Sequence, residues 1–251
     1  MKPLIEQIIL LCTVILVFIS STIPGCIMPG CIQGSGNYTS ENRTVDNFRG
    51  IDLSGIGDVY LTQGENHLRI EAEDNIIKQM KTDVAGGRLS IYHKAGCINS
   101  RQPIKIFVST PELDSLSISG SGRIISQSPI KSDALSLGIS GSGSMELDMV
   151  CRDLETIISG SGTALLKGEA AYNKIIISGS GAMHGYDLLT DRTEATISGS
   201  GIAEINVQHE LSTLISGSGS IYYKGNPTNI SQTVSGSGRV IVLESAENGG
   251  H

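Results

Sequence analysis

The sequence has few of the side chains that build large globular cores or charged binding faces. It contains no Trp and only three Phe in 251 residues, which excludes a core of large aromatic side chains. Lys and Arg number 18 against 25 Asp and Glu, and they form no basic cluster. With a formal net charge of −7, the chain lacks the electrostatic footprint of a nucleic-acid-binding protein, so we expect no nucleic-acid partner.

Motifs of common catalytic and metal sites are missing as well. The sequence has no phosphate-binding loop and no dinucleotide fingerprint between a strand and a helix. Ser121 has Ser119 and Arg123 two residues away, where a nucleophile elbow has glycines. The histidines share no ligand spacing and calcium-binding repeats do not occur, so we predict no metal and no cofactor. These histidines are His67, His93, His184, His209 and His251.

Carboxylates are present but scattered. Glycoside hydrolysis needs two carboxyl groups at a defined separation. The acidic residues form two loose groups whose positions in their repeats differ, so we interpret them as solvated surface charge and predict a protein that is not an enzyme. The groups are Asp187, Asp191, Glu194 and Glu204, and Asp148, Asp153 and Glu155.

The abundant features are glycine, with 31 residues, and a Ser-Gly-Ser-Gly tetrapeptide that occurs seven times. Successive copies are 21, 19, 19, 20, 18 and 19 residues apart. A fixed period near 20 is typical of solenoids, in which each repeat is one rung stacked on its neighbours. The copies begin at Ser119, Ser140, Ser159, Ser178, Ser198, Ser216 and Ser235.

Apolar residues around each tetrapeptide alternate with a period of two. Ile or Val precedes every copy, and apolar residues resume at alternate positions after it, as at Met145, Leu147 and Met149. This alternation indicates strands, so we predict an all-β fold, a parallel β-solenoid with rungs of about 19 residues. In extended segments the β-branched residues and glycines face inward and both serines face outward.

Two interpretations of the glycines remain. Gly-x-Gly can supply the backbone freedom for a corner between two strands, or it can let two walls of a flat face approach closely. We favour the corner, because a 19-residue rung must bend two or three times. In either case the serines form two columns over six intervals of about 4.8 Å, roughly 29 Å in all. This predicted surface ladder comprises Ser119, Ser121, Ser140, Ser142, Ser159, Ser161, Ser178, Ser180, Ser198, Ser200, Ser216, Ser218, Ser235 and Ser237.

Residues 1–32 have the order of a secretory signal, with Lys2, an apolar run and small polar residues before Gly25 and Cys26. This ending matches a lipobox, which predicts lipidation of Cys26, and Cys31 is a weaker second candidate. An uncleaved anchor is the alternative, because 25 residues from Ile8 to Ile32 are uncharged and about 20 apolar residues span a bilayer. Both alternatives place the rest outside the cytoplasm, with membrane lipid as a partner.

The remaining chain divides into four parts. Residues 33–47 are polar and predict a tether. Residues 48–111 predict a cap, with a hairpin formed by residues 59–61 and 68–70 and one short helix that begins near Asp74. Residues 112–243 contain the repeat, and we expect residues 244–251 to be a disordered tail. Three glycosylation sequons begin at Asn37, Asn42 and Asn229.

Three cysteines remain outside the signal and the lipobox position, which is an odd number. Cys97 and Cys151 could pair outside the cell, or they could be free buried thiols. Nothing in the spacing decides between these alternatives.

The pattern resembles the putative auto-transporter adhesin, head GIN domain family. The resemblance rests on residues 48–64, 87–91 and 111–113, followed by the Ser-Gly-Ser-Gly copies, and covers about residues 44 to 243. It implies a right-handed parallel β-helix on a cell surface and supplies no catalytic residue.

These observations together predict a membrane-tethered, extracytoplasmic binding or adhesion module that contacts a glycan or another protein. Two alternatives stay open. One is a structural envelope protein without a discrete ligand, and the other is a polysaccharide-active enzyme built on the same type of fold.

Overall fold

The computed structural model describes residues 30–94 and 96–243. Residues 1–29 of the expected signal segment, which include Cys26, and the expected tail from residue 244 lie outside the described residues. Residues 31 and 32, expected to belong to the signal segment, are instead part of the fold. Within the described part, no helix has both the length and the apolar character needed to cross a membrane.

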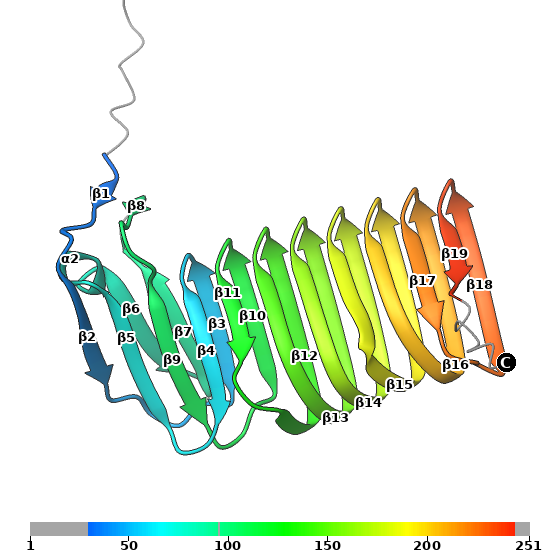
Figure 1. Ribbon diagram of the computed structural model, residues 1–251, viewed down its shortest axis with the longest axis horizontal. Helices are drawn as coiled ribbons and strands as arrows, with labels where there is room; N and C mark the ends of the chain where they lie inside the picture. The colour runs from blue at the N-terminus through cyan, green and yellow to red at the C-terminus, as the bar shows by residue number, and fades with distance from the viewer. Residues whose placement is uncertain (1–29, 95, 244–251) are drawn as a thin grey trace, which may run out of the picture.

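Each turn of the described chain contributes one strand to each of two facing sheets, which gives a parallel β-solenoid (Figure 1). We call sheet A the sheet whose strands run toward the Ser-Gly-Ser-Gly corner, and sheet B the sheet whose strands leave it. Five long strands belong to both sheets because they bend around the outer turn opposite that corner. They are β12 (Ile130–Gly141), β13 (Ser144–Gly160), β14 (Thr163–Gly179), β15 (Ala182–Gly199) and β16 (Ile202–Gly217). Sheet A also contains β3 (Gly50–Gly55), β10 (Ser115–Gly120) and β18 (Asn229–Gly236), and sheet B also contains β4 (Asp58–Gln63), β11 (Arg123–Ser126), β17 (Ser220–Lys224) and β19 (Arg239–Val242).

Equivalent residues of successive turns lie side by side in parallel register. Ile139 pairs with Ile118 on one side and with Ile158 on the other, and the serine that follows each of them pairs in the same way. The predicted all-β fold, a parallel β-helix with rungs of about 19 residues and an atypical N-terminal cap, is confirmed.

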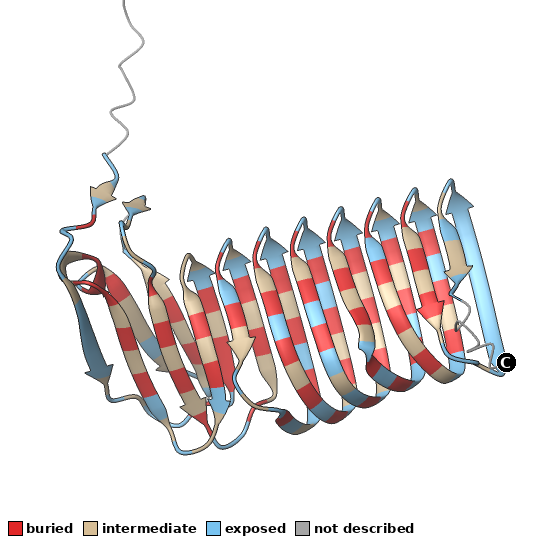
Figure 2. Ribbon diagram, in the orientation of Figure 1, coloured by how far each residue is buried: buried red, intermediate tan, exposed pale blue. Residues whose placement is uncertain are grey.

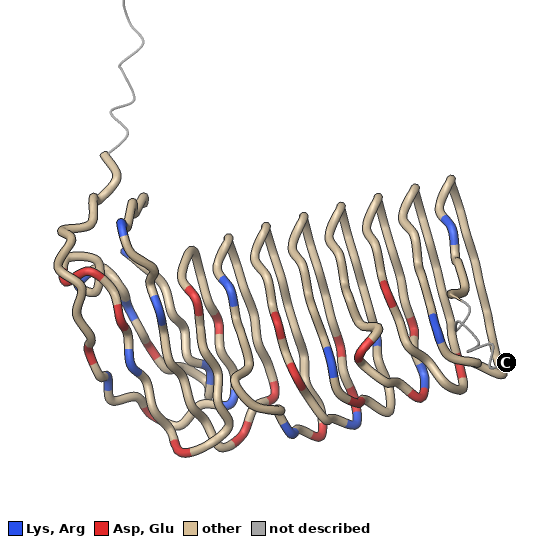
Figure 3. Tube along the Cα trace, in the orientation of Figure 1, with Lys and Arg blue, Asp and Glu red and all other residues tan. Residues whose placement is uncertain are grey.

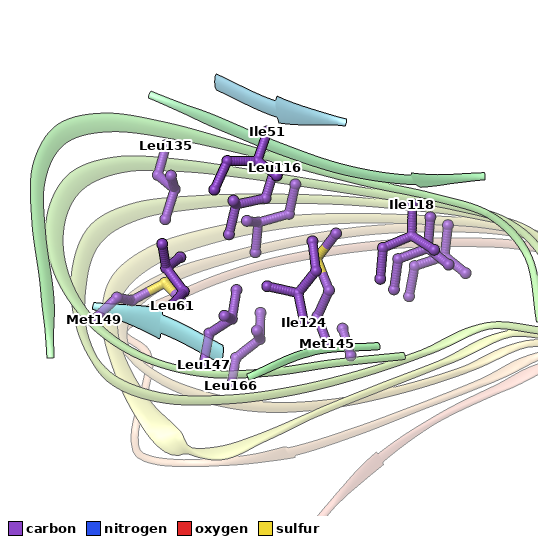
Figure 4. Packing of buried hydrophobic residues seen from close by; sticks show 14 of the residues in the cluster. Ile51, Leu61, Leu116, Ile118, Ile124, Leu135, Met145, Leu147, Met149 and Leu166 are labelled. Atoms are coloured by element: carbon purple, nitrogen blue, oxygen red, sulfur yellow. The ribbon is translucent and has the colours of Figure 1, made fainter. Parts of the chain in front are cut away.

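Thin layers of aliphatic side chains fill the space between the sheets. Buried and exposed residues alternate along every long strand (Figure 2). Leu116 and Ile118 of sheet A meet Ile124 and Met145 of sheet B in the interior (Figure 4). The rarity of aromatic residues therefore suits a core that is only two side chains thick.

The N-terminal cap extends both sheets beyond the first turn. In sheet B the order is β2 (Tyr38–Arg43), β5 (His67–Glu73), β9 (Lys105–Thr110) and then β4. In sheet A, β7 (Arg88–His93) pairs with β3, and β6 (Met80–Ala85) pairs with β7. The expected short helix is α2, which covers only Asp74–Ile77.

Two expectations for this region are wrong. The hairpin predicted between residues 59–61 and 68–70 does not form, because β9 lies between β4 and β5 and pairs with both. The predicted tether is not free chain either, since β2 pairs antiparallel with β5. Its start is also held, because β1 (Ile32–Gln33) pairs with β8 (Ile98–Asn99).

The two ends of the solenoid differ. The N-terminal end carries β2, α2 and β6, whereas the C-terminal end finishes on β18 and β19. All eight residues of β18 are exposed, which is visible as a continuous pale strand in Figure 2.

Candidate functional site: the serine corner

The seven Ser-Gly-Ser-Gly copies form one straight edge along the solenoid, which we call the serine corner (Figure 1). The first serine of each copy is the last but one residue of a strand of sheet A, which ends at the first glycine, and the second serine follows in the turn. All fourteen serines are exposed. Within the part of the chain that the structure describes, none of their hydroxyl groups hydrogen-bonds to another protein atom.

The first glycine of each copy makes the corner. Its φ angle lies between +112° and +128° in all seven copies, a region that L side chains rarely adopt. A Cβ atom on Gly160 would also lie 2.7 Å from the carbonyl oxygen of Gly141 in the preceding turn. The corner interpretation of the glycines is therefore confirmed.

The second glycine lets the corner close against the core. Gly162 is buried, and a Cβ atom there would lie 2.4 Å from the Cγ2 atom of Ile139. The Ile or Val before each tetrapeptide thus fills the space that glycine leaves in the next turn.

Backbone hydrogen bonds continue from turn to turn through the corner. The amide of Ser142 donates to the carbonyl of Gly120 at 2.9 Å, and the amide of Ser144 donates to Gly122 at 3.1 Å. The same pattern recurs in later turns, as from Ser161 to Gly141. Because the backbone groups are satisfied in this way, the side-chain hydroxyls stay available to solvent or to a ligand.

The serine corner is uncharged, whereas charges lie on the two sheets and the outer turns (Figure 3). Many of these charges pair across neighbouring turns. Lys174 Nζ lies 3.0 Å from a Glu155 oxygen, and Lys167 Nζ lies 3.7 Å from an Asp148 oxygen. The protein therefore presents a neutral edge beside faces of mixed charge.

The structure does not bring the acidic residues of each sequence group into one site. Glu204 lies on sheet B and contacts His184 at 2.7 Å, whereas Glu194 lies on sheet A and accepts a hydrogen bond of 2.9 Å from Tyr172. Asp191 lies at an outer turn and contacts His209. Among the described residues, no three His, Cys, Asp or Glu side chains are grouped to hold a metal ion.

The cysteines pair differently from the expectation that Cys97 could bond to Cys151. Cys97 forms a disulfide with Cys31, 66 residues away in sequence, so Cys31 is part of the fold and unavailable for lipid. Cys151 is a free, buried thiol on the inner side of an outer turn. Burial, aided by the negative charge of Asp153, raises the pKa of this thiol to about 11.

The three sequon asparagines lie at the surface. Asn37 and Asn42 are exposed in the cap, and Asn229 is exposed at the start of β18. The Asn37 amide donates to an Asp74 carboxylate oxygen at 3.4 Å.

Two further features of the structure could not be predicted from the sequence. A cleft of about 500 Å³ lies where the cap meets the repeat, with Arg49 and Lys131 among its lining residues. In sheet B, the rings of Tyr60 and Phe107 stack at 5.2 Å, and the Arg69 guanidinium lies 4.3 Å from the Phe107 ring centre. These residues are far apart in sequence, and only the placement of β9 between β4 and β5 brings them together.

The same fold occurs in solved structures of putative adhesins and of a putative lipid binding protein. A putative adhesin from Bacteroides fragilis is 26% identical, with a TM-score of 0.79 over 84% of this chain and 100% of that one. A putative lipid binding protein from Parabacteroides distasonis is 25% identical, with a TM-score of 0.73 over 86% of this chain and 100% of that one. A putative adhesin from Parabacteroides distasonis shares the fold at 22% identity and a TM-score of 0.70, over 85% and 100% of the two chains.

No curated protein matches the sequence. The model of the putative auto-transporter adhesin, head GIN domain family, however, matches residues 47–227, which include the cap and most of the repeat. The chain therefore belongs to the putative auto-transporter adhesin, head GIN domain family.

Proposed function

We propose that this protein is a membrane-tethered extracytoplasmic binding module that contacts an extracellular glycan along the serine corner. The observation that carries the proposal is the row of fourteen exposed serines, whose hydroxyl groups have no hydrogen-bond partner among the described residues. Each hydroxyl can donate one hydrogen bond and accept others, which matches the hydroxyl groups of a sugar polymer.

The chemistry of the edge favours a glycan over a folded protein. Protein interfaces depend on a few buried aromatic or arginine anchors. The seven copies offer only Ser and Gly, with neither a charge nor an apolar anchor. A repeating ligand would instead gain affinity by engaging several turns at once, because each added contact acts at a high effective concentration.

Binding of a glycan array by the full chain in detergent tests this proposal. The informative variant carries Ser161→Gln, Ser180→Gln and Ser200→Gln, which block three adjacent corner tips at residues with ordinary negative φ angles. The matched control carries Ser136→Gln, Ser212→Gln and Ser231→Gln, which lie on sheet A away from the corner.

We expect the corner variant to lose at least tenfold in apparent affinity while the control binds as the wild type does. Equal binding by both variants would move the site to the sheets or the outer turns. Absence of binding by the wild type would favour the structural envelope protein, and turnover of a polysaccharide would favour the enzyme.

The membrane tether is a separate part of the proposal and rests on the lipobox at Cys26. Since Cys31 is bonded to Cys97, only residues 27–30 separate the lipidation position from the fold. Cys26→Ser should abolish incorporation of a fatty-acid probe and shift the protein from the detergent phase to the aqueous phase. Retention in the detergent phase would instead indicate an uncleaved anchor.

A further inference from the structure

The last turn of the solenoid exposes residues that occupy core positions in every earlier turn. Ile230 continues the column of Leu211, and Val234 continues the column of Ile215. Leu211 and Ile215 have no exposed surface, whereas Ile230 is 47% exposed and Val234 is 43% exposed. The apolar layer is therefore left open at the C-terminal end.

Sheet B also exposes a core position at its last strand, β19. Val242 continues the column of Tyr223 and is 50% exposed. Together with the unpaired outer backbone groups of β18, these side chains form a surface that we call the open end, made of Ile230, Gln232, Val234, Val240 and Val242. An apolar strand edge of this kind is a template for pairing with a further strand.

The open end lacks the charges that protect strand edges elsewhere in the protein. None of the eight residues of β18 is charged. At the other end, the outermost strand β2 contains Glu41 and Arg43, and β6 contains Lys81 and Asp83. This contrast disfavours head-to-tail stacking of copies, because an apolar edge would then meet a charged one.

The sequence of β18 is instead complementary to itself. In an antiparallel pair centred on Gln232, Ile230 faces Val234 of a second copy, and Val234 faces Ile230 of that copy. The two Gln232 side chains then meet on the two-fold axis, where each amide can donate to and accept from the other. A single polar pair within an apolar contact fixes the register, since any shift leaves the amides unpaired.

We propose that the protein pairs with a second copy of itself through the open end, with β18 antiparallel to β18 of the partner copy about a two-fold axis at Gln232. The contact is isologous, so it closes as a dimer. The described chain begins at the opposite end of the solenoid (Figure 1). The first described residues of the two copies therefore lie at the two far ends of the pair, which suits copies on two facing membranes. That last consequence rests on the proposed tether, whereas the pairing itself does not.

Self-association of the full chain in detergent, measured by sedimentation, tests the pairing. We expect a dimer for the wild type and at least a tenfold weaker dimer for Ile230→Lys. The matched control is Leu214→Lys, because Leu214 is 46% exposed but points outward from sheet A on the neighbouring strand. A monomeric wild type, or equal effects of the two variants, would overturn the proposal.

Cysteine cross-linking tests the register. Gln232→Cys should form a disulfide between two copies on mild oxidation, while Thr233→Cys, which points outward, should form at least tenfold less. Preferential linkage at residue 233 would rule out the two-fold axis at Gln232.

Vesicles that carry the full chain should aggregate. Ile230→Lys should abolish this aggregation while leaving glycan binding unchanged. Absence of glycan binding by a protein that still forms the dimer would count against the serine corner and not against the pairing.

Discussion

The hydroxyl of Ser100 donates a hydrogen bond of 2.8 Å to the carboxylate of Glu73, a side chain with no exposed surface. The backbone amides of Gly36 and Arg101 donate to the same carboxylate at 2.7 and 2.8 Å. Burial alone would raise the pKa of this group, but the hydrogen bonds outweigh it and hold the pKa below its usual 4.5. Glu73 thus joins the N-terminal segment to the loop before β9.

Glu73→Gln should lower the melting temperature near neutral pH, because an amide cannot accept from all three donors. The lowered folded pKa means that the ionised carboxylate stabilises the fold above the unfolded value of 4.5, and that this stability is lost as the pH falls through the folded value. Thermal unfolding at several pH values below neutral should therefore show a shallower acid slope for the variant. Glu71→Gln, which removes a partly exposed ion pair with Arg69, is the control and should lower the melting temperature near neutral pH much less than Glu73→Gln does.

Gly179→Ala should destabilise the solenoid by about 1–3 kcal/mol, the cost of a side chain in a disfavoured backbone region. Gly179 has a φ of +113°, and its added Cβ would lie 2.7 Å from the carbonyl oxygen of Gly160. At Gly138 the nearest atom to an added Cβ is 3.8 Å away, so Gly138→Ala should be neutral or stabilising by about 0.5 kcal/mol. Urea unfolding measures both, and equal losses would contradict the corner geometry.

Asn173→Leu should stabilise the protein by about 1–3 kcal/mol, since both amide atoms of Asn173 are buried and have no hydrogen-bond partner within residues 30–94 and 96–243. Its register neighbours in sheet A are Leu154 and Thr193. Thr190→Val is the opposing control, because the Thr190 hydroxyl bonds to Thr193 at 2.7 Å and to the carbonyl of Asn206 at 2.8 Å. Destabilisation by Asn173→Leu in urea unfolding would indicate that an internal water satisfies the amide.

Cys151 should resist alkylation in the folded protein at about pH 8. A pKa of about 11, raised from 9.0, reduces the thiolate fraction about 100-fold, and the side chain is only 8% exposed. Mass spectrometry of the peptide that contains Cys151 follows the reaction, and Arg152→Cys provides an exposed reference thiol one residue away. Similar rates at the two positions would show that the outer turn opens frequently.

The repeat could be predicted from sequence because local pattern and long-range contact coincide in it. Every turn repeats the same inward positions, so the alternation around Met145 and the spacing of about 19 residues between serine copies already predict the parallel register. The serine corner was predicted for the same reason. The glycines of the corner are required because each turn packs against an equivalent turn, which leaves no space for a side chain.

The cap could not be predicted in this way, because its contacts join dissimilar segments. Apolar and polar residues do not alternate along β2, because most of that strand is exposed. Its polar composition is therefore the same as that of a flexible tether, and the sequence does not distinguish the two. The position of β9 between β4 and β5 depends on residues about 40 positions downstream. Cys31 was one of three cysteines whose spacing did not decide a pairing, so its bond to Cys97 could not be predicted.

That bond also decides how the protein carries mechanical load. A pull on the N-terminus enters the fold at Cys31 and crosses directly to Cys97, so the intervening chain, with β2 and α2, bears no tension. From Cys97 the force reaches β9, which is hydrogen-bonded along its length to β4 on one side and to β5 on the other. Force along such a strand shears many hydrogen bonds at once, whereas force on β2 would peel its bonds one at a time. Reduction of a single disulfide would therefore convert a shear-loaded attachment into one that unzips.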